Sequence, residues 1–131
     1  MKQPDMNIKG TAKTIVTEDK LAINMESGNL AVFATPAMTT LMEKAACNCI
    51  ADYLDENETT VGTELNIQHT SATPKGMNVT AEAVLISVNG RIISFEVTAY
   101  DECGNIGFGT HKRAIVGSER FTEKTYQKLN K

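Results

Sequence analysis

The sequence is poor in the features that mark several classes of protein. Its 131 residues include no Trp, four Phe, three Tyr and three Cys. No apolar run approaches the length of a membrane span, and the N-terminus lacks the apolar core of a signal peptide. Basic and acidic residues are interspersed along the chain, and the net charge is −3. The sequence therefore contains no basic stripe that could follow a phosphate backbone. We therefore expect a cytoplasmic protein that binds neither membrane nor nucleic acid.

The cysteines do not indicate a disulfide framework or a metal site. Their number is odd, and Cys47 and Cys49 would fall on opposite sides of a helix. We interpret them as reduced thiols that pack like small apolar side chains, which fits a reducing compartment. No nucleotide-binding loop, zinc-ligand spacing or nucleophile elbow is present, so we expect no metal and no organic cofactor.

One segment, residues 34–54, has a clear helical period. Its apolar residues recur at three- and four-residue steps and would form one stripe: Met38, Leu41, Met42, Ala45, Ala46, Cys49, Ile50 and Tyr53. Thr35 followed by Pro36 is typical of an N-cap and a first helical residue. Glu43 lies at the margin of the stripe, about 100° from its centre.

After this helix the apolar period changes to two, which predicts strands. The expected strands cover residues 60–70, 77–88, 92–100 and 106–116, with an earlier one over 11–17. In the first of the four, Val61, Leu65, Ile67 and His69 would share one face. Asn89-Gly90 predicts a hairpin, and the tail from Ser118 a short surface helix.

These elements predict one α+β domain over residues 1–131, without repeats or linkers. A long central helix would be wrapped by a curved antiparallel sheet, whose last four strands form a meander. The sheet would expose its edges, and a second copy is a natural cover for one of them. We therefore expect a homodimer, or a tetramer built from such dimers.

Three polar residues are candidates for chemistry, and each has a structural alternative. His69, at the end of a core-facing row, suits a general base, although a hydrogen-bonded core histidine is the commoner case. Glu43 on its own would be a solvated glutamate. The Thr35 hydroxyl would lie beside the helix N–H groups, where developing negative charge is favoured, but threonine is also an ordinary capping residue.

Two further features could contact a ligand. Gly62 interrupts a strand, which indicates a bulge or a close backbone approach that would leave its amide free. His111-Lys112-Arg113, on the last strand, gathers basic groups that together with Lys75 could meet the phosphates of an anionic ligand. The alternative is a solvated strand face.

With Thr35, Glu43 and His69 identified, the chain resembles the hotdog-fold thioesterases, and among them the fluoroacetyl-CoA thioesterase-like family. The matching segments are residues 33–46, with Phe33-Ala34-Thr35-Pro36 and Met42-Glu43-Lys44; residues 61–76, with Val61-Gly62-Thr63 and His69-Thr70; and residues 109–116, with His111-Lys112-Arg113. The resemblance extends over nearly the whole chain.

The resemblance implies a homodimeric hotdog acyl-CoA thioesterase that needs no cofactor beyond the CoA of its substrate. It assigns catalysis to Thr35, Glu43 and His69, and the thioester carbonyl contact to Gly62. The further residues expected to bind substrate are Phe33, Lys75, Gly76, His111 and Arg113. Members selective for fluoroacetyl-CoA carry phenylalanines before the helix, whereas residues 26–32 here contain no aromatic. The sequence therefore predicts thioester hydrolysis but not fluoroacetyl selectivity.

Two other functions fit the same fold. A hotdog hydratase or dehydratase would use the histidine with a different acidic partner, and the threonine and glutamate on the helix argue against it. A non-catalytic dimer that binds acyl-CoA or a small ligand would not need all three polar residues. Hydrolysis of a short acyl-CoA is the hypothesis that uses all of them.

Overall fold

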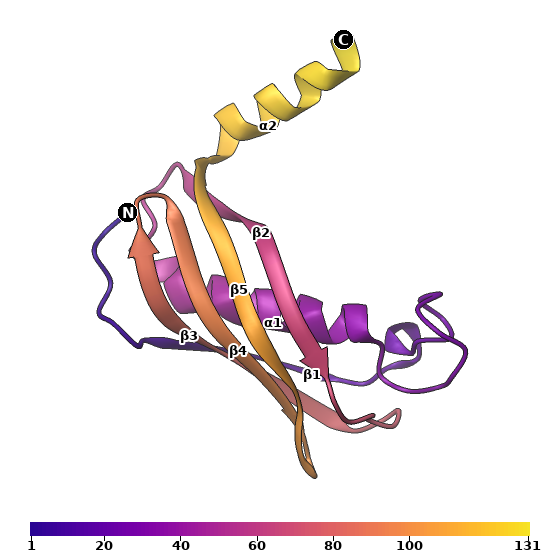
Figure 1. The fold of residues 1–131 in the computed structure, drawn as a ribbon. Coiled ribbons are helices and arrows are strands. Elements are labelled where there is room, and N and C mark those ends of the chain that lie inside the picture. Colours follow the sequence, from indigo (N-terminus) through magenta and orange to yellow (C-terminus); the bar gives the residue numbers. More distant parts are fainter.

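The computed structural model describes residues 1–131 and places one long helix against a five-stranded antiparallel sheet (Figure 1). The helix, α1, spans Thr35–Ile50 and continues as a 3-10 turn over Ala51–Tyr53. The strands are β1 Lys9–Ile15, β2 Glu58–His69, β3 Asn78–Asn89, β4 Ile92–Asp101 and β5 Gly104–Gly117. The predicted α+β architecture of a helix wrapped by a curved sheet is confirmed.

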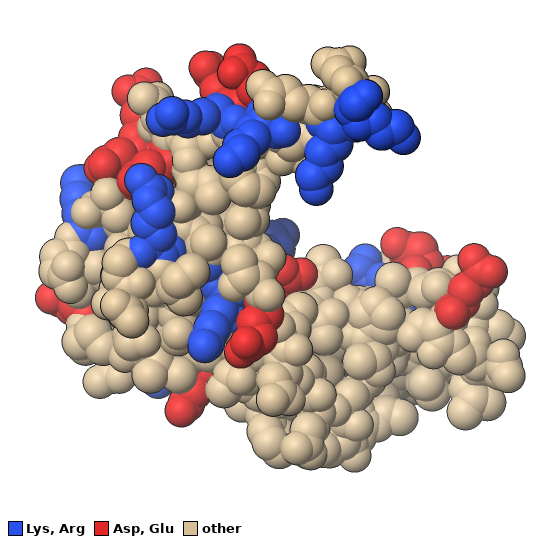
Figure 2. Space-filling model, turned by 45° about the horizontal axis from the view of Figure 1, so that its top comes forward, with Lys and Arg blue, Asp and Glu red and all other residues tan.

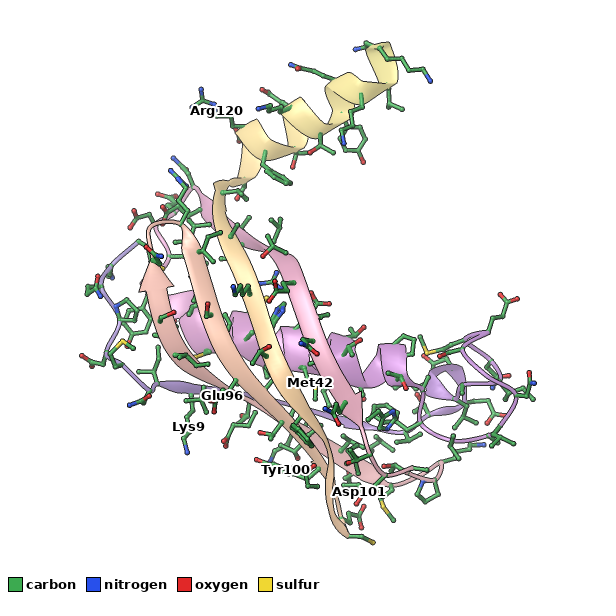
Figure 3. All side chains as sticks on the ribbon, viewed as in Figure 1. Lys9, Met42, Glu96, Tyr100, Asp101 and Arg120 are labelled. Atoms are coloured by element: carbon green, nitrogen blue, oxygen red, sulfur yellow. The ribbon has the colours of Figure 1, made fainter.

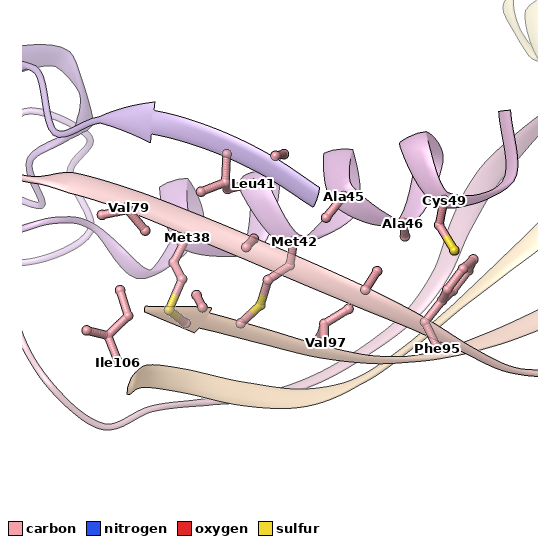
Figure 4. Close-up of a cluster of buried hydrophobic side chains, with 14 of the residues drawn as sticks. Met38, Leu41, Met42, Ala45, Ala46, Cys49, Val79, Phe95, Val97 and Ile106 are labelled. Carbon is pink, nitrogen blue, oxygen red and sulfur yellow. The ribbon is translucent and has the colours of Figure 1, made fainter. Parts of the chain in front are cut away.

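The apolar stripe of α1 faces the sheet as its period predicts. Its members from Met38 to Ile50 are all buried, and Met38, Met42 and Ile50 are fully so (Figure 4). Met42 points from the helix toward the strands (Figure 3). Gly10 lets β1 pass close to α1, because a Cβ there would collide with the backbone of Ala45 and Cys49. Burial of each large apolar side chain contributes about 1.5–3 kcal/mol.

The alternation predicted for the middle strands is confirmed. The inward residues are fully or almost fully buried: Val79, Ala81, Ala83 and Leu85 on β3, and Ile93, Phe95, Val97 and Ala99 on β4. The β3–β4 hairpin turns at Gly90, whose φ of +63° lies in the left-handed region. The side chains of these two strands and of α1 form the hydrophobic core.

The strand order is β1-β3-β4-β5-β2, so the predicted four-stranded meander is wrong for β2. This strand pairs with β5 instead of β3 and forms one edge of the sheet. The connection from β2 to β3 cannot close as a tight hairpin, because its backbone bonds elsewhere. Phe33 N–H donates to Thr73 O at 2.9 Å, and Gly76 N–H donates to Val16 O at 2.8 Å.

A bulge between Gly62 and Glu64 changes which residues of β2 face the helix. Gly62 pairs with Arg113 and Leu65 pairs with His111, and cross-strand partners share a face. Gly62 therefore faces inward before the bulge, and Leu65 does so after it. The prediction that Val61 shares the face of Leu65 is wrong, because one extra residue separates the two halves of the strand.

The chain ends in an arm that stands away from the sheet (Figure 1). It consists of α2, Ser118–Tyr126, and a 3-10 turn over Gln127–Asn130, and all of its residues are exposed. The predicted surface helix is thus present. No helix of the structure is long and apolar enough to cross a membrane.

Candidate active site

Two of the three predicted catalytic residues meet at the start of α1. Thr35 Oγ1 lies 2.8 Å from His69 Nδ1, where α1 begins and β2 ends. The predicted N-cap role of Thr35 is wrong: Ala34, with φ −75° and ψ 142°, occupies the N-cap position, and Thr35 is the first helical residue. Its hydroxyl is therefore directed at the histidine instead of at a helix N–H group.

His69 is held in the form that a general base needs. Burial lowers the pKa of His69, and the nearby backbone of Ser71 only partly opposes that effect. For Nδ1 to accept the Thr35 O–H, the single ring proton must lie on Nε2. Nε2 is buried and has no hydrogen-bond partner in the structure. Hydroxyl and neutral imidazole together have the geometry of an activated nucleophile and its base.

Thr35 and His69 line a pocket of about 350 Å³. Its wall is built by the segment before α1 and by the segment that follows β2; the lining residues include Ser27, Asn29, Leu30, Val32, Phe33, Thr70, Ser71 and Ala72. Phe33 is 1% exposed, so this predicted substrate-binding residue forms the wall of the pocket from within the core. A pocket of this size lies at the lower end of the range for small-molecule sites, about 300–1,000 Å³. We call Thr35, His69 and this pocket the threonine half-site.

Glu43, the third predicted catalytic residue, lies in a different cluster. Its Oε2 is 3.2 Å from Arg113 Nη1. Arg113 also donates from Nε to Thr60 Oγ1 at 2.8 Å and from Nη2 to Thr60 O at 3.0 Å. Only 8% of the Arg113 side chain is exposed, against 38% of Glu43. The arginine is thus fixed by several hydrogen bonds and holds the more exposed carboxylate in place.

His111 completes this cluster as a neutral acceptor. Its Nδ1 lies 2.9 Å from Glu64 O, and its Nε2 lies 3.2 Å from Arg113 Nη1. Because a carbonyl oxygen and a guanidinium N–H fix the two roles, Nδ1 donates and Nε2 accepts. Burial lowers the pKa of His111, and the charge of Arg113 lowers it further.

Gly62 lies against the same carboxylate. A Cβ on Gly62 would be 2.7 Å from Glu43 Oε2, which confirms that this glycine permits a close approach. A small pocket of about 230 Å³ opens here, lined by Glu43, Gly62, Thr63, Glu64, Leu65 and His111. We call Glu43, Gly62, His111 and Arg113 the glutamate half-site.

The structure does not gather the predicted phosphate contacts. His111 and Arg113 are buried on the side of β5 that faces α1, whereas Lys75 forms an ion pair with Glu18 at 2.7 Å. The alternative of a solvated strand face holds only for Lys112, which lies 4.0 Å from Glu64. Gly76 occupies a turn at φ +93° and lines neither half-site.

Within one chain the two half-sites are well separated. Glu43 follows Thr35 by eight residues of α1, which is about 12 Å along the axis. Gly62 precedes His69 by about 20 Å of strand. A single chain therefore brings Thr35 and His69 together but leaves Glu43 and Gly62 apart from them.

Sequence reasoning missed the residues that support the pocket wall. Thr73 is fully buried, and its hydroxyl donates to Asp101 Oδ2 at 2.7 Å. Burial raises the pKa of Asp101, but hydrogen bonds from Thr73 and from the N–H groups of Cys103 and Gly104 outweigh this and lower it. The Asp101–Gly104 turn is a recognisable Asx signal in the sequence, although its partner Thr73 is not. No three His, Cys, Asp or Glu side chains are grouped so that they could hold a metal ion.

The chain is similar in sequence and in fold to proteins of known function. The chain is 46% identical over 97 residues to the fluoroacetyl-CoA thioesterase of Streptantibioticus cattleyicolor, an alignment covering 74% of this chain and 70% of the relative. It superposes on the fluoroacetyl-CoA thioesterase FlK with a TM-score of 0.89 at 39% identity, over 96% of this chain and 98% of that one. For an FlK mutant in complex with acetyl-CoA the TM-score is 0.90 at 36% identity, over 95% and 98% of the two chains.

The fold and these relatives thus define a thioesterase of the hotdog superfamily. Residues 16–119 match the family model of the fluoroacetyl-CoA-specific thioesterases. The chain belongs to this family.

Proposed function

We propose that this protein hydrolyses short-chain acyl-CoA thioesters to the free acid and CoA, with Thr35 and His69 at the reaction centre. The observation that carries the proposal is the 2.8 Å contact between the Thr35 hydroxyl and the His69 imidazole at the mouth of a small pocket. Family membership supports the choice of an acyl-CoA as substrate.

The pair can promote hydrolysis by two routes. In the first, Thr35 Oγ attacks the thioester carbonyl while His69 Nδ1 takes the hydroxyl proton; the C–S bond breaks, the proton passes to the CoA sulfur, and water then hydrolyses the threonyl ester. In the second, His69 Nδ1 takes a proton from a water that attacks the carbonyl directly, and Thr35 donates a hydrogen bond to the carbonyl oxygen. The C–S bond then breaks, and the proton passes from His69 to the CoA sulfur. In both routes the N-terminal end of α1 favours the negative charge that develops on the carbonyl oxygen.

A homodimer would unite the two half-sites. β2 is an edge strand, and antiparallel edge strands of two identical chains can pair about a two-fold axis. If that axis passes midway between residues 65 and 66, His69 of one chain lies beside Gly62 of the other. Thr35 and His69 would then face Glu43 and Gly62 of the partner subunit. We therefore propose that the active site needs two copies of one domain spanning residues 1–131.

The acyl group that fits should be short, and selection for fluoroacetyl is not expected. Residues 26–32, which include part of the pocket wall, contain no aromatic side chain. Leu30 is 68% exposed and covers the opening only loosely. We expect acetyl and other short acyl groups to be accepted alongside fluoroacetyl.

A panel of acyl-CoAs tests the proposal by the release of free thiol. We expect turnover of acetyl-, fluoroacetyl-, propionyl- and butyryl-CoA, falling with longer chains, and its loss in Thr35→Ala and His69→Ala. Binding of acyl-CoA without thiol release by the unmodified protein would contradict a hydrolase and indicate a binding dimer. A quench followed by mass spectrometry separates the two routes, because only the first leaves an acyl group on Thr35.

A further inference from the structure

The C-terminal arm, residues 118–131, is exposed throughout and could contact a partner or a ligand. It projects beyond the sheet, and its main contact with the rest of the chain is β5 (Figure 1). Helices shorter than about 12 residues are marginal in water without packing. A second surface or a ligand would therefore stabilise a helix of nine residues in this position.

One side of the arm is basic. Arg120, Lys124 and Lys128 follow one another at four-residue steps, which places them along one side, and Lys131 comes next in the chain. Four of the 13 Lys and Arg residues of the protein thus lie in its last 12 positions. Figure 2 shows Lys and Arg side chains along this projecting arm, above the hollow beneath it. Arg120 extends from the first turn of α2 (Figure 3).

The positive charges of the arm are not neutralised within the chain. The ion pairs of the lysine and arginine side chains use Lys9, Lys20, Lys75, Lys112 and Arg113, and none of the four cations of the arm. The acidic residues of α2, Glu119 and Glu123, lie on a different side of the helix by the rotation per residue. A basic surface of this kind attracts a polyanion.

A second side of the arm is apolar. Phe121, Tyr126 and Leu129 are exposed by 42%, 63% and 78%. By the rotation per residue, Tyr126 and Leu129 lie about 60° apart and point away from the basic side, whereas Phe121 lies at its border. The arm can therefore rest on a neighbouring subunit through one side while the other remains free.

The substrate of the proposed function is a polyanion whose phosphates lack a partner so far. The diphosphate and the ribose phosphate of CoA call for basic groups, but His111 and Arg113 are buried and Lys75 is paired with Glu18. Among the remaining cations, only the arm carries several close together in sequence on one side of an element.

The position of the arm points to the site of the partner subunit. α2 begins where Gly117 pairs with Glu58, at the start of β2, whereas His69 lies at the other end of that strand. An antiparallel copy paired along β2 would bring its own His69 to the end of the sheet from which the arm projects. The arm would then lie near the threonine half-site of the partner subunit.

We propose that the basic side of the arm binds the phosphate groups of an acyl-CoA whose acyl group occupies the threonine half-site of the partner subunit, while the apolar side packs on that subunit. The inference rests on the proposed function and adds a nucleotide subsite to it. It concerns binding of the CoA moiety and not the chemical step.

Kinetics with truncated substrates test the subsite. In the double variant Lys124→Glu/Lys128→Glu, the KM for the preferred acyl-CoA should rise about tenfold with kcat nearly unchanged, since two exposed charges are reversed. The same acyl group on pantetheine, which has no nucleotide, should show no such change. Lys13→Glu, an exposed lysine on β1 at the opposite edge of the sheet, is the matched control and should leave both KM values unchanged.

Several results would overturn the subsite. An unchanged KM for acyl-CoA would mean that other groups bind the phosphates, and an equal rise for acyl-pantetheine would mean that the arm acts on the fold or the assembly. Binding of the unmodified protein to anionic phospholipid vesicles, lost in the double variant while KM stays constant, would assign the arm to a lipid surface. If no acyl-CoA is hydrolysed, titration calorimetry with CoA and pantetheine still decides: weaker CoA binding by the double variant supports the subsite although the proposed function fails.

Mixed dimers test whether the arm acts across the interface. Thr35→Ala chains, with an intact arm, are combined with Lys124→Glu/Lys128→Glu chains, with an intact threonine. If the arm serves the partner subunit, the intact threonine of the mixed dimer lies beside an intact arm, and a low KM returns. A KM that stays at the value of the double variant would show that the arm serves its own chain and would contradict the proposal.

Discussion

Thr35 and His69 are 34 positions apart in the chain, and their side chains meet at 2.8 Å where the long helix begins and an edge strand ends. Eight residues further along the helix, Glu43 is held by Arg113 in a second cluster. The separation of these two clusters is the central feature of the molecule, because under the proposed function one chain holds only part of the active site.

Substitutions at the threonine half-site should remove activity while leaving the fold intact. We expect His69→Ala to lower kcat by about 10²–10⁴, the usual contribution of a general base. Thr35→Ala should be similarly impaired, and Thr35→Ser should retain part of the activity. Thr40→Ala is the control: its exposed hydroxyl donates to Pro36 O at 2.9 Å on the same helix and should not affect kcat. Equal activity of Thr35→Ala and Thr40→Ala would remove Thr35 from the mechanism.

The pH dependence of kcat/KM should follow the neutral form of His69. Only the neutral ring can take the threonine proton, so activity should rise with pH as His69 loses its proton. Because burial lowers the pKa of His69 below its ordinary value of 6.5, the midpoint of the acid limb should lie below pH 6.5. Initial rates with a short acyl-CoA from pH 4.5 to 8 measure it. A midpoint above 6.5 would speak against this environment for His69.

Stability should fall as the pH drops below 6.5. The pKa values of His69 and His111 are both lowered in the folded state, so below 6.5 the unfolded chain binds protons more readily than the folded one. The free energy of unfolding then decreases toward acid until the folded-state pKa values are passed. Carboxylates with lowered pKa values also change the free energy of unfolding with pH, but only below their ordinary pKa values of 4.5 or less.

Urea unfolding at pH 7.5 and 5.5 measures this effect. In His111→Gln the side chain can still donate to Glu64 O or accept from Arg113 but cannot take up a proton, so the difference between the two pH values should shrink. The same difference in His111→Gln as in the unmodified protein would show that His111 does not contribute.

Gly62→Ala should damage the glutamate half-site. A Cβ there would be 2.7 Å from Glu43 Oε2, so the carboxylate must move. We expect a lower kcat but only a small loss in the free energy of unfolding, because the atom that must move is the end of a flexible, partly exposed side chain. Gly117→Ala is the matched control on the neighbouring strand, since its Cβ would be 3.9 Å from Arg120 Cβ and its φ is −78°. Thermal melts and kinetics of the two variants should differ in this way; matching results would rule out a special role for Gly62.

Much of the fold could be predicted from the sequence because the signals are local. The stripe from Met38 to Ile50 repeats within one helix, and the inward residues of β3 and β4 alternate within each strand. The strand with which β2 pairs could not be predicted from local patterns. It depends on backbone hydrogen bonds that residues 73–77 make with Val16 and Phe33. The bulge after Gly62 was indicated by the glycine, but its effect on the register was not.

The sequence indicates candidate residues for the site but not how they are arranged. The sequence predicts Thr35 as an N-cap, because a threonine side chain suits both a helix cap and a nucleophile and the residue type does not distinguish them. His111 and Arg113 looked like surface cations, since alternation along a strand does not say which side is buried. The pairing of Glu43 with Arg113 joins positions 70 apart, which no local pattern reveals.

The measurement that tests the central claim most directly is complementation between Thr35→Ala and Glu43→Ala chains. If each active site combines Thr35 and His69 of one subunit with Glu43 of the other, a mixed dimer contains one intact site and one with both defects. Unfolding and refolding the two inactive proteins together should then restore thioesterase activity to about a quarter of the unmodified level, as random pairing of two chains predicts. If the mixture stays as inactive as its components while it forms mixed dimers, the site lies within one chain and the account is wrong.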